Sequence, residues 1–208
     1  MTPIRIIAGL GNPTRPHERD RHNAGFWFIE RYAQSLGISL TKDPKYHAII
    51  GKTRGDGGDV WLVMPQTYMN LSGKSVGALA RFFKITPPEI LVVHDELDFA
   101  PGTAKFKQGG GVAGHNGLKD IAAQLASQDF WRIRVGIGHP GDRNLVADWV
   151  LASPSPTDRE SIDATIDRGL AVMPHVLSGD MTAAMRQLHA KPAVPKTEPP
   201  KKPLATKD

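Results

Sequence analysis

Apolar positions follow two different periods along the chain, and their alternation predicts an α/β fold. Short apolar runs rich in β-branched residues are typical of buried strands, and alternating polar and apolar residues are typical of an edge strand. The predicted strands are PIRIIAGL, YHAIIGKT, VWLVMP, EILVVHDELD, TAKFKQ and WRIRVGIG, of which TAKFKQ has the alternating pattern.

Helical spacing of apolar residues predicts helices between these strands. Asn23 is expected to cap a helix over 24–36 that stops at Gly37, and Ser72 to cap a second helix that ends before Pro87. Further helices are predicted over about 118–127, over 157–177 with a bend or end at Pro174, and over about 181–189.

The order of these elements predicts one domain. The RGDGGD turn joins YHAIIGKT to VWLVMP as a hairpin, which inserts an antiparallel pair among strands that otherwise alternate with helices. We therefore expect a single α/β domain over residues 1–190, with a twisted, mixed and largely parallel sheet and helices on both faces.

The charge of the chain is concentrated at its C-terminus. The formal net charge is +5, and residues 191–208 hold five lysines against Glu198 and Asp208, a net of +3, which leaves +2 for residues 1–190. The same segment holds five prolines and few large apolar side chains, so we expect a disordered Lys/Pro-rich tail. Any nucleic-acid site must therefore depend on a local basic patch.

Several classes of protein are excluded by composition. The sequence has no cysteine, which rules out disulfides, thiolate metal sites and cysteine nucleophiles. We find no apolar run of the roughly 20 residues that would span a bilayer and no signal-peptide pattern. We therefore expect a cytoplasmic protein with no membrane partner.

Three glycine-rich segments imitate nucleotide-binding motifs. GLGNPT has Thr14 at the third glycine position, and SGKS lacks the P-loop glycine because Tyr68 stands there. GGGVAG matches G-x-G-x-x-G, but Asp129 precedes the next strand instead of following it, where a ribose-binding acid should stand. Tight turns and close backbone approach are the favoured interpretation of all three.

Polar residues at the ends of predicted strands form a more informative set. Asn12, Asn70 and Asp95 follow three strands, and His22 lies in the loop after the first. Residues beyond the carboxyl ends of parallel strands converge on one crevice, which can bring an imidazole to a carboxylate with amides around them.

Other chemistries are less well supported by the sequence. A zinc site of the common helical type needs two histidines four residues apart on one helix, with a glutamate between them. None of His22, His94, His115 and His139 is part of such a pair, so no metal site is expected. No G-x-S-x-G elbow indicates a serine triad.

The strings GLGNP, RHNAG, PQTYMNLSGKSV, VVHDELD, GTAKFKQGGGVAGHNGLKDI and RIRVGIGHPG, in this order, resemble the bacterial peptidyl-tRNA hydrolase family. The resemblance runs from about Ile4 to His189 and implies a monomeric, metal-independent enzyme without a cofactor. Its substrate would be peptidyl-tRNA, in which it cleaves the ester between the peptide and the 3′-terminal ribose, which rescues ribosomes and recycles tRNA.

The resemblance also implies the roles of individual residues. His22 would be the catalytic base and Asp95 its orienting partner. The substrate-binding residues would be Asn12, Tyr68, Met69, His115 and Asn116, with Asn70 beside them in the cleft. The contacts to tRNA phosphates would be Lys105, Lys107 and Arg134.

The chemistry of these residue types agrees with the implied roles. A ribose ester is activated enough for water to attack it with the help of a base near neutral pKa, which imidazole supplies. The Asn70 amide is our candidate donor to the developing oxyanion. Asn12 and Asn116 can both donate and accept, so they could recognise a peptide bond that a free amino group does not present.

The chain departs from the family pattern near its candidate base. Thr14, His17 and Asp20 stand where glycine, tyrosine and threonine are usual, and Val112–Ala113 replace a more polar or glycine-rich pair. Two rival hypotheses remain open on the sequence alone. They are a non-catalytic RNA-binding module, which need not retain the His22–Asp95 pair, and a nucleotide-dependent enzyme built on GGGVAG.

Overall fold

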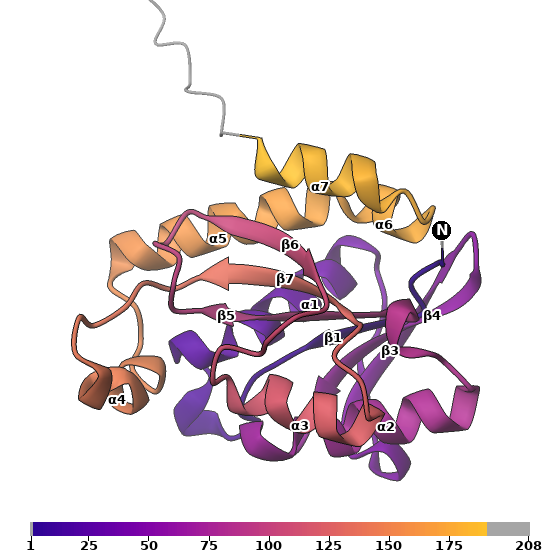
Figure 1. Ribbon diagram of the computed structural model, residues 1–208, viewed down its shortest axis with the longest axis horizontal. Coiled ribbons are helices and arrows are strands. Elements are labelled where there is room, and N and C mark those ends of the chain that lie inside the picture. The colour runs from indigo at the N-terminus through magenta and orange to yellow at the C-terminus, as the bar shows by residue number, and fades with distance from the viewer. Residues whose placement is uncertain (1, 191–208) are drawn as a thin grey trace, which may run out of the picture.

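The computed structural model describes residues 2–190, which fold around one seven-stranded sheet (Figure 1). The strand order is β2-β3-β4-β1-β5-β7-β6. The bounds are β1 Ile6–Gly9, β2 Thr41–Asp43, β3 Ala48–Gly55, β4 Gly58–Pro65, β5 Ile90–Glu96, β6 Ala104–Gln108 and β7 Trp131–Gly136. Strands β4, β1, β5 and β7 are parallel, whereas β2–β3, β3–β4 and β6–β7 pair antiparallel.

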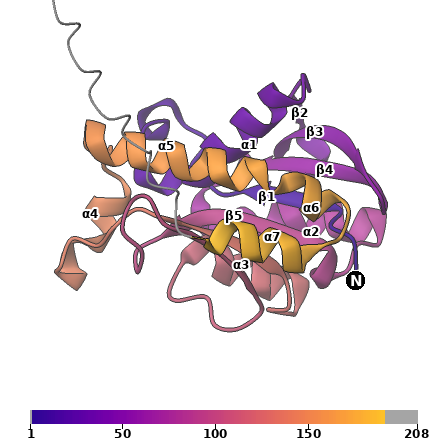
Figure 2. The ribbon, with the colours of Figure 1, turned by 90° about the horizontal axis from the view of Figure 1, so that it is seen from above.

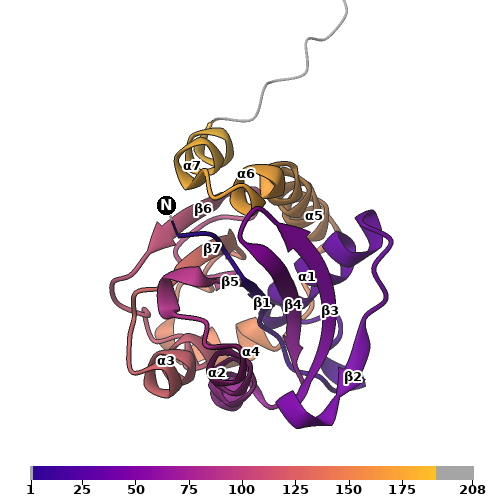
Figure 3. The ribbon, with the colours of Figure 1, turned by 90° about the vertical axis from the view of Figure 1, so that its right-hand side faces the viewer.

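Helices cover both faces of the sheet, as Figures 2 and 3 show. The α-helices are α1 Ala24–Ser35, α2 Ser72–Phe83, α3 Asn116–Leu125, α4 Val146–Val150, α5 Pro156–Ala171, α6 Met173–Leu177 and α7 Met181–His189. The 3₁₀ helices are η1 Arg15–His17, η2 Arg21–Asn23, η3 Pro44–Tyr46, η4 Met69–Leu71, η5 Pro87–Glu89 and η6 Arg143–Leu145.

The core lies in two layers, one on each side of the sheet. Ile7 of β1 packs into the layer beneath α1, α5, α6 and α7, while Ile6 and Ala8 pack into the layer beneath α2 and α3. All four residues of β1 are buried. Because successive side chains of a strand point to opposite faces, only a continuous apolar run can fill both layers. The predicted fold class is therefore confirmed.

The boundaries of several helices differ from the prediction. The helix expected over 157–177 divides into α5 and α6 at Val172, and Pro174 lies in the first turn of α6, where its missing N–H costs no helical hydrogen bond. Helix α3 begins at Asn116, two residues earlier than expected. Strand β2 and helix α4 were not predicted, because three- and five-residue elements carry too little periodicity.

Two capping predictions were wrong. Asn23 and Ser72 do stand at helix starts, but neither side chain caps its helix. The Asn23 side chain instead accepts from the Asn12 N–H at 2.8 Å and donates to the Asn12 carbonyl at 3.0 Å. The Ser72 hydroxyl donates to the Met69 carbonyl at 2.8 Å. In both cases the backbone of another residue, and not the start of the helix, is the hydrogen-bond partner.

Two glycines let α1 lie directly on the sheet. A Cβ atom on Gly25 would overlap the Leu10 nitrogen and the Val93 carbonyl oxygen, and one on Gly9 would overlap the Gly25 carbonyl. This close approach sets η2, which precedes α1, against β5. The residues of η2 therefore face the end of β5.

Within residues 2–190, no helix is both long and apolar enough to cross a membrane. The tail predicted to be disordered, 191–208, lies outside the described residues.

Candidate active site

The candidate site lies at the carboxyl ends of the parallel strands. Asn12 follows β1, Met69 and Asn70 lie in η4 after β4, and Asp95 is near the end of β5. His22 enters from η2. A cavity of about 780 Å³ opens beside these strand ends, and its lining extends from His22 to Val150 along the chain. The predicted convergence at this edge of the sheet is what the parallel topology produces.

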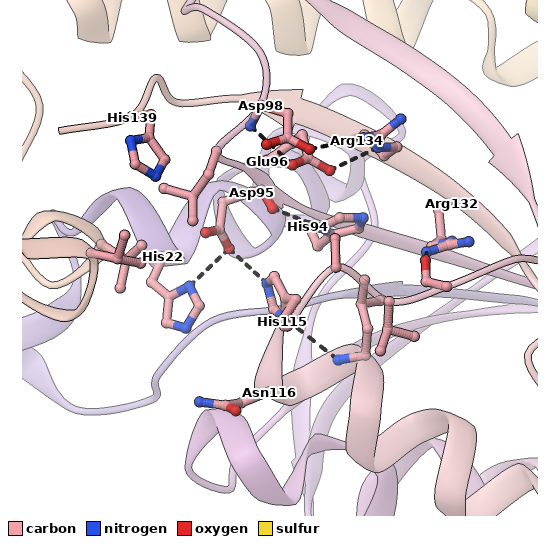
Figure 4. Close-up of a pocket in the computed structure, with 18 of the residues that line it drawn as sticks. His22, His94, Asp95, Glu96, Asp98, His115, Asn116, Arg132, Arg134 and His139 are labelled. Atoms are coloured by element: carbon pink, nitrogen blue, oxygen red, sulfur yellow. Dashed lines mark hydrogen bonds and ion pairs between the residues drawn. The ribbon is translucent and has the colours of Figure 1, made fainter. Parts of the chain in front are cut away.

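A single carboxylate oxygen joins two imidazoles at the centre of the site (Figure 4). Asp95 Oδ1 lies 2.9 Å from His22 Nδ1 and 2.9 Å from His115 Nε2. Asp95 is 3% exposed and His22 9% exposed. In Figure 4 the remaining ring nitrogen of His22, Nε2, points away from Asp95 toward the side where Asn116 lies. The histidine is therefore held by one nitrogen and offers the other to the cavity.

The electrostatics of this group favour an ionised Asp95. Burial raises the pKa of the Asp95 carboxyl, but the two imidazoles outweigh burial and hold that pKa well below its usual range. Burial lowers the pKa of His22. The charge and hydrogen bond of Asp95, together with the charge of Asp20, raise this pKa by more than burial lowers it, so the net shift is upward. His22 therefore binds a proton more readily than a free imidazole does.

His94, the neighbour of Asp95, is a buried neutral imidazole. Burial, the adjacent His115 and Arg132 lower its pKa to about 3, against the opposing effect of Asp95. Its Nδ1 donates to the Asp95 backbone carbonyl at 2.7 Å, and its buried Nε2 has no hydrogen-bond partner among residues 2–190. From the sequence, His94 was considered only as a metal ligand, because burial is not visible in the HD dipeptide.

The ligand atoms of His22, Asp95 and His115 all lie within 4.8 Å of one another, a spacing at which a metal ion could be held. In this arrangement, however, both imidazole nitrogens that face the ionised carboxylate donate a hydrogen bond to it, so neither directs a lone pair at a common point. This hydrogen-bond pattern suits proton transfer.

Asn12 connects the strand ends beneath this group. Its backbone is held by Asn23, and its Oδ1 accepts from the Met69 N–H at 3.0 Å. The amide nitrogen of Asn12 is thereby left to donate to a ligand. Met69 is buried, whereas Tyr68 is 65% exposed and Asn70 and Asn116 are exposed.

The structure brings only some of the predicted site residues into one cavity. The predicted residues in its lining are His22, Asp95, Lys107, His115, Asn116 and Arg134, and His139 also lines the cavity. The predicted residues outside that lining are Asn12, Tyr68, Met69, Asn70 and Lys105. Asn12 follows β1, Tyr68 directly precedes η4, and Lys105 is on β6.

The predicted basic patch lies on the paired strands β6 and β7. Lys105 pairs with Arg134 and Lys107 with Arg132 across the antiparallel ladder. Lys105 is exposed and Lys107 is half-buried. Arg134 donates from Nε to Glu96 at 2.7 Å, and its guanidinium lies 4.3 Å from the centre of the Phe99 ring.

Two buried arginines support the walls of the cavity, a role that the sequence did not reveal. Arg132, 2% exposed, donates to the carbonyls of Gly109, Gly110 and Gly111 and so fixes the glycine-rich loop that forms one wall. The glycines that accept these hydrogen bonds lie 21 to 23 residues from Arg132, so no short-range sequence pattern predicts them.

Arg21 supports the opposite wall of the cavity in the same way. Its guanidinium donates to the carbonyls of Trp149, Ala152 and Ser153 and lies 3.7 Å from the centre of the Trp149 ring. The residue directly before His22 therefore holds the segment that contains α4. These partners lie 128 to 132 positions away in the chain, beyond any sequence signal.

The α/β sheet with a paired histidine and aspartate at its carboxyl edge defines a hydrolytic type of enzyme site, in which an oriented imidazole can activate water. Residues 6–196 match the model of the family described as peptidyl-tRNA hydrolase. The chain belongs to the peptidyl-tRNA hydrolase family.

Individual relatives agree over nearly the whole chain. The peptidyl-tRNA hydrolase of Leptothrix cholodnii is 56% identical over 95% of this chain and 92% of its own length. That of Pseudomonas entomophila is 55% identical over 93% of this chain and 100% of its own length. The crystal structure of peptidyl-tRNA hydrolase from Acinetobacter baumannii superposes with a TM-score of 0.88 at 44% identity, covering 91% of this chain and 96% of that one. The resemblance inferred from the motifs is confirmed.

Proposed function

We propose that this chain hydrolyses the ester between the peptide and the 3′-terminal ribose of peptidyl-tRNA, with His22 as the general base. Hydrolysis of peptidyl-tRNA is the activity for which the family is named. The observation that carries the assignment of the base is the hydrogen bond from His22 Nδ1 to Asp95 Oδ1, because it leaves Nε2 free at the cavity.

In the proposed reaction, His22 Nε2 removes a proton from a water molecule as the water oxygen attacks the ester carbonyl carbon. The imidazolium that forms is stabilised by the ionised Asp95. Collapse of the tetrahedral intermediate breaks the bond between the carbonyl carbon and the ribose oxygen, and His22 returns its proton to that oxygen. The products are a tRNA with a free ribose hydroxyl and a peptide with a free carboxyl group, which releases its proton to solvent.

The oxyanion of the intermediate needs a donor, and we assign this role to the Asn70 amide. Asn70 is exposed at the end of β4, and it belongs to η4, which packs against α3. An amide donor of this kind contributes roughly 3 kcal/mol of transition-state stabilisation.

Recognition of the peptide is assigned to the residues around Asn12. The Asn12 amide nitrogen can donate to a peptide carbonyl, and Asn116 lies on the side of the cavity to which His22 Nε2 points. Met69 and the exposed Tyr68 supply apolar surface, and His115 lies beside His22 with the ring centres 5.0 Å apart. An aminoacyl ester, which has a charged amino group instead of a peptide bond, would leave these amides unpaired.

Binding of tRNA phosphates is assigned to Lys105, Lys107 and Arg134. The three lie together on β6 and β7, and Lys107 and Arg134 line the same cavity as His22. We further propose that residues 1–190 form the catalytic domain, because the lining of the cavity falls entirely between His22 and Val150. A monomer in the cytoplasm would be sufficient for this activity, since one chain supplies every group named.

The decisive experiment measures release of peptide from an N-blocked aminoacyl-tRNA by the wild type and by His22→Ala. We expect the wild type to turn over the substrate with a chelator present and His22→Ala to lose activity by two or more orders of magnitude. His47→Asn is a matched control, because His47 is exposed and has a positive φ of 50° that asparagine tolerates.

Equal rates for the wild type and His22→Ala would remove His22 from the mechanism. Loss of wild-type activity on chelation would instead show that a metal ion takes part. Thermal unfolding of each variant, followed by circular dichroism, separates a catalytic loss from a folding defect.

A further inference from the structure

His115 has both ring nitrogens engaged, on opposite sides of the ring. Its Nδ1 lies 3.2 Å from the Gly117 nitrogen and 3.4 Å from the Leu118 nitrogen, in the first turn of α3. Its Nε2 lies 2.9 Å from Asp95 Oδ1. The ring therefore spans the gap between the N-terminus of a helix and the acid that holds the catalytic base.

These contacts fix the tautomer of His115. Backbone N–H groups only donate, so Nδ1 must present a lone pair to them, and the single ring proton of the neutral imidazole must lie on Nε2. An N–H at Nε2 is what a carboxylate oxygen accepts. A proton on Nδ1 would face two N–H groups in the first turn of the ten-residue helix α3 and would break both of these contacts.

His22 is in a different position. Its Nδ1 binds the same oxygen of Asp95, but among the described residues no hydrogen bond fixes its Nε2. Of the two imidazoles on Asp95, only His22 can gain a proton without losing a contact. The pair is chemically asymmetric although both rings lie 2.9 Å from the acid.

We propose that His115 is a positioning residue, a hydrogen-bond donor that holds Asp95 Oδ1 for His22 and reduces the negative charge that His22 meets there. This inference rests on the proposed role of His22 as general base. It replaces direct contact with the substrate as the main role of His115, since neither of its ring nitrogens is left to bind a ligand.

The proposal has a consequence for acidity. A carboxylate that accepts one N–H from a permanent donor attracts an imidazolium less strongly than one without such a donor. Loss of the His115 donor should therefore raise the pKa of His22 and leave more of it protonated near neutral pH. The other ionisable groups that act on these residues are Asp20 on His22, and His94 with Arg132 on the far side of Asp95. All three stay constant in the comparisons below.

Two amide substitutions separate the two ends of the His115 ring. In His115→Asn the side-chain oxygen falls near the position of Nδ1 and can still cap α3, since asparagine is a favoured N-cap residue, but nothing reaches Asp95. In His115→Gln the amide nitrogen falls near the position of Nε2 and can still donate to Asp95, but the cap is lost. His115→Ala removes both contacts.

The experiment measures the pKa of His22 by NMR titration of its ring in the full chain, together with the pH profile of kcat/KM on N-blocked aminoacyl-tRNA. We expect His115→Asn and His115→Ala to raise the His22 pKa by about one unit, which is a tenfold change in proton affinity. We expect His115→Gln to keep it within a few tenths of a unit of the wild type. The control His47→Asn should leave it unchanged.

The opposite order of the two amide variants would overturn the proposal. If His115 only caps α3, His115→Asn should match the wild type and His115→Gln should be the impaired variant. The wild type provides a test that does not depend on any variant folding. Its His115 ring must show the Nε2–H tautomer in nitrogen-15 spectra near pH 7, and an Nδ1–H ring or an imidazolium would contradict the inference.

The same data distinguish this proposal from the role of His22. If His22→Ala were fully active, His22 would not be the base, yet the NMR titration would still report whether His115 controls its pKa. If His22→Ala were inactive and the titration of His22 were the same in all the His115 variants, only the positioning role would fail.

Discussion

The Nδ1 atom of His22 lies 2.9 Å from Oδ1 of Asp95, although the two residues are 73 positions apart in the chain. This contact decides which nitrogen of the imidazole can act as a base. Because Nδ1 faces the acid, only Nε2 can take a proton from water in the cavity. The following predictions test this arrangement, the basic patch and the packing that supports both.

Replacing Asp95 with an isosteric amide should reduce turnover and shift the pH profile. We expect Asp95→Asn to lower kcat by about 10²- to 10⁴-fold, because the amide neither fixes the tautomer of His22 nor stabilises its charge. In the wild type, activity should rise with pH and level off above 6.5, since the pKa of His22 is raised. In the variant, burial is the main effect that remains, so the inflection should move to lower pH. An inflection that stayed in place would show that Asp95 does not control His22.

Lys107, which lines the cavity, should affect the binding of tRNA rather than the hydrolysis of the ester. We expect Lys107→Ala to raise KM for tRNA substrates. The slope of log KM against log salt concentration should fall by roughly one, which is the change expected for loss of a single phosphate contact. Turnover of a small N-blocked amino acid ester should be nearly unchanged. Lys42→Ala is a matched control, because Lys42 is an exposed lysine on β2, at the opposite edge of the sheet. A collapse of kcat on the small ester would contradict a role in tRNA binding.

Burial of His94 should make the fold sensitive to acid. The pKa of His94 is about 3 in the folded protein and 6.5 as its ordinary value. Below pH 6.5 the unfolded chain therefore binds a proton that the folded chain rejects, and stability falls as the pH falls toward 3. The loss reaches up to about 4 kcal/mol at the low end of this window.

We expect His94→Asn to flatten this dependence, because asparagine can still donate to the Asp95 carbonyl but does not titrate. The measurement is urea unfolding of both proteins from pH 7 to pH 4, compared by slope and not by absolute stability. Parallel curves for the two proteins would rule out His94 as the source of acid sensitivity.

Gly25, in the first turn of α1, should be intolerant of any side chain. We expect Gly25→Ala to destabilise the protein by about 3 kcal/mol, since its Cβ would overlap backbone atoms of Leu10 and Val93 that cannot move independently of the sheet. The unfolding temperature should fall on the order of 10 °C. Gly111→Ala is the control, because a Cβ there meets no atom within 4 Å and the backbone does not require glycine. Similar unfolding temperatures for the two variants would refute the close approach.

Much of the fold was predictable because it depends on short-range pattern. Continuous apolar runs identified β1 and β5, and alternation identified the edge strand β6. The elements that were not predicted, β2 and α4, are too short for periodicity. The two capping errors have one cause. In each case another backbone group binds the side chain: Asn23 is bound to the distant Asn12, and the Ser72 hydroxyl donates to the carbonyl of Met69, only three residues earlier.

The edge of the sheet at which the candidate site lies was predictable, but the lining of its cavity was predictable only in part. The rule that residues beyond parallel strand ends converge was enough to group Asn12, Asn70, Asp95 and His22 from the sequence. It could not say that His115 shares an oxygen of Asp95, or that buried arginines hold the two walls of the cavity. These contacts join residues that are 20 to 132 positions apart.

By itself, the sequence determined the order and type of the main elements, the edge of the sheet where polar groups gather, and the family to which the chain belongs. Periodicity, turn chemistry and motif strings are properties of residues close together in the sequence, so the sequence alone is enough to identify them. Only the tertiary structure decided which ring nitrogen of His22 faces Asp95, which arginines bind backbone carbonyls, and which amides lie outside the cavity lining. Those properties depend on burial and on hydrogen bonds between distant segments, which exist only once the helices have packed on the sheet.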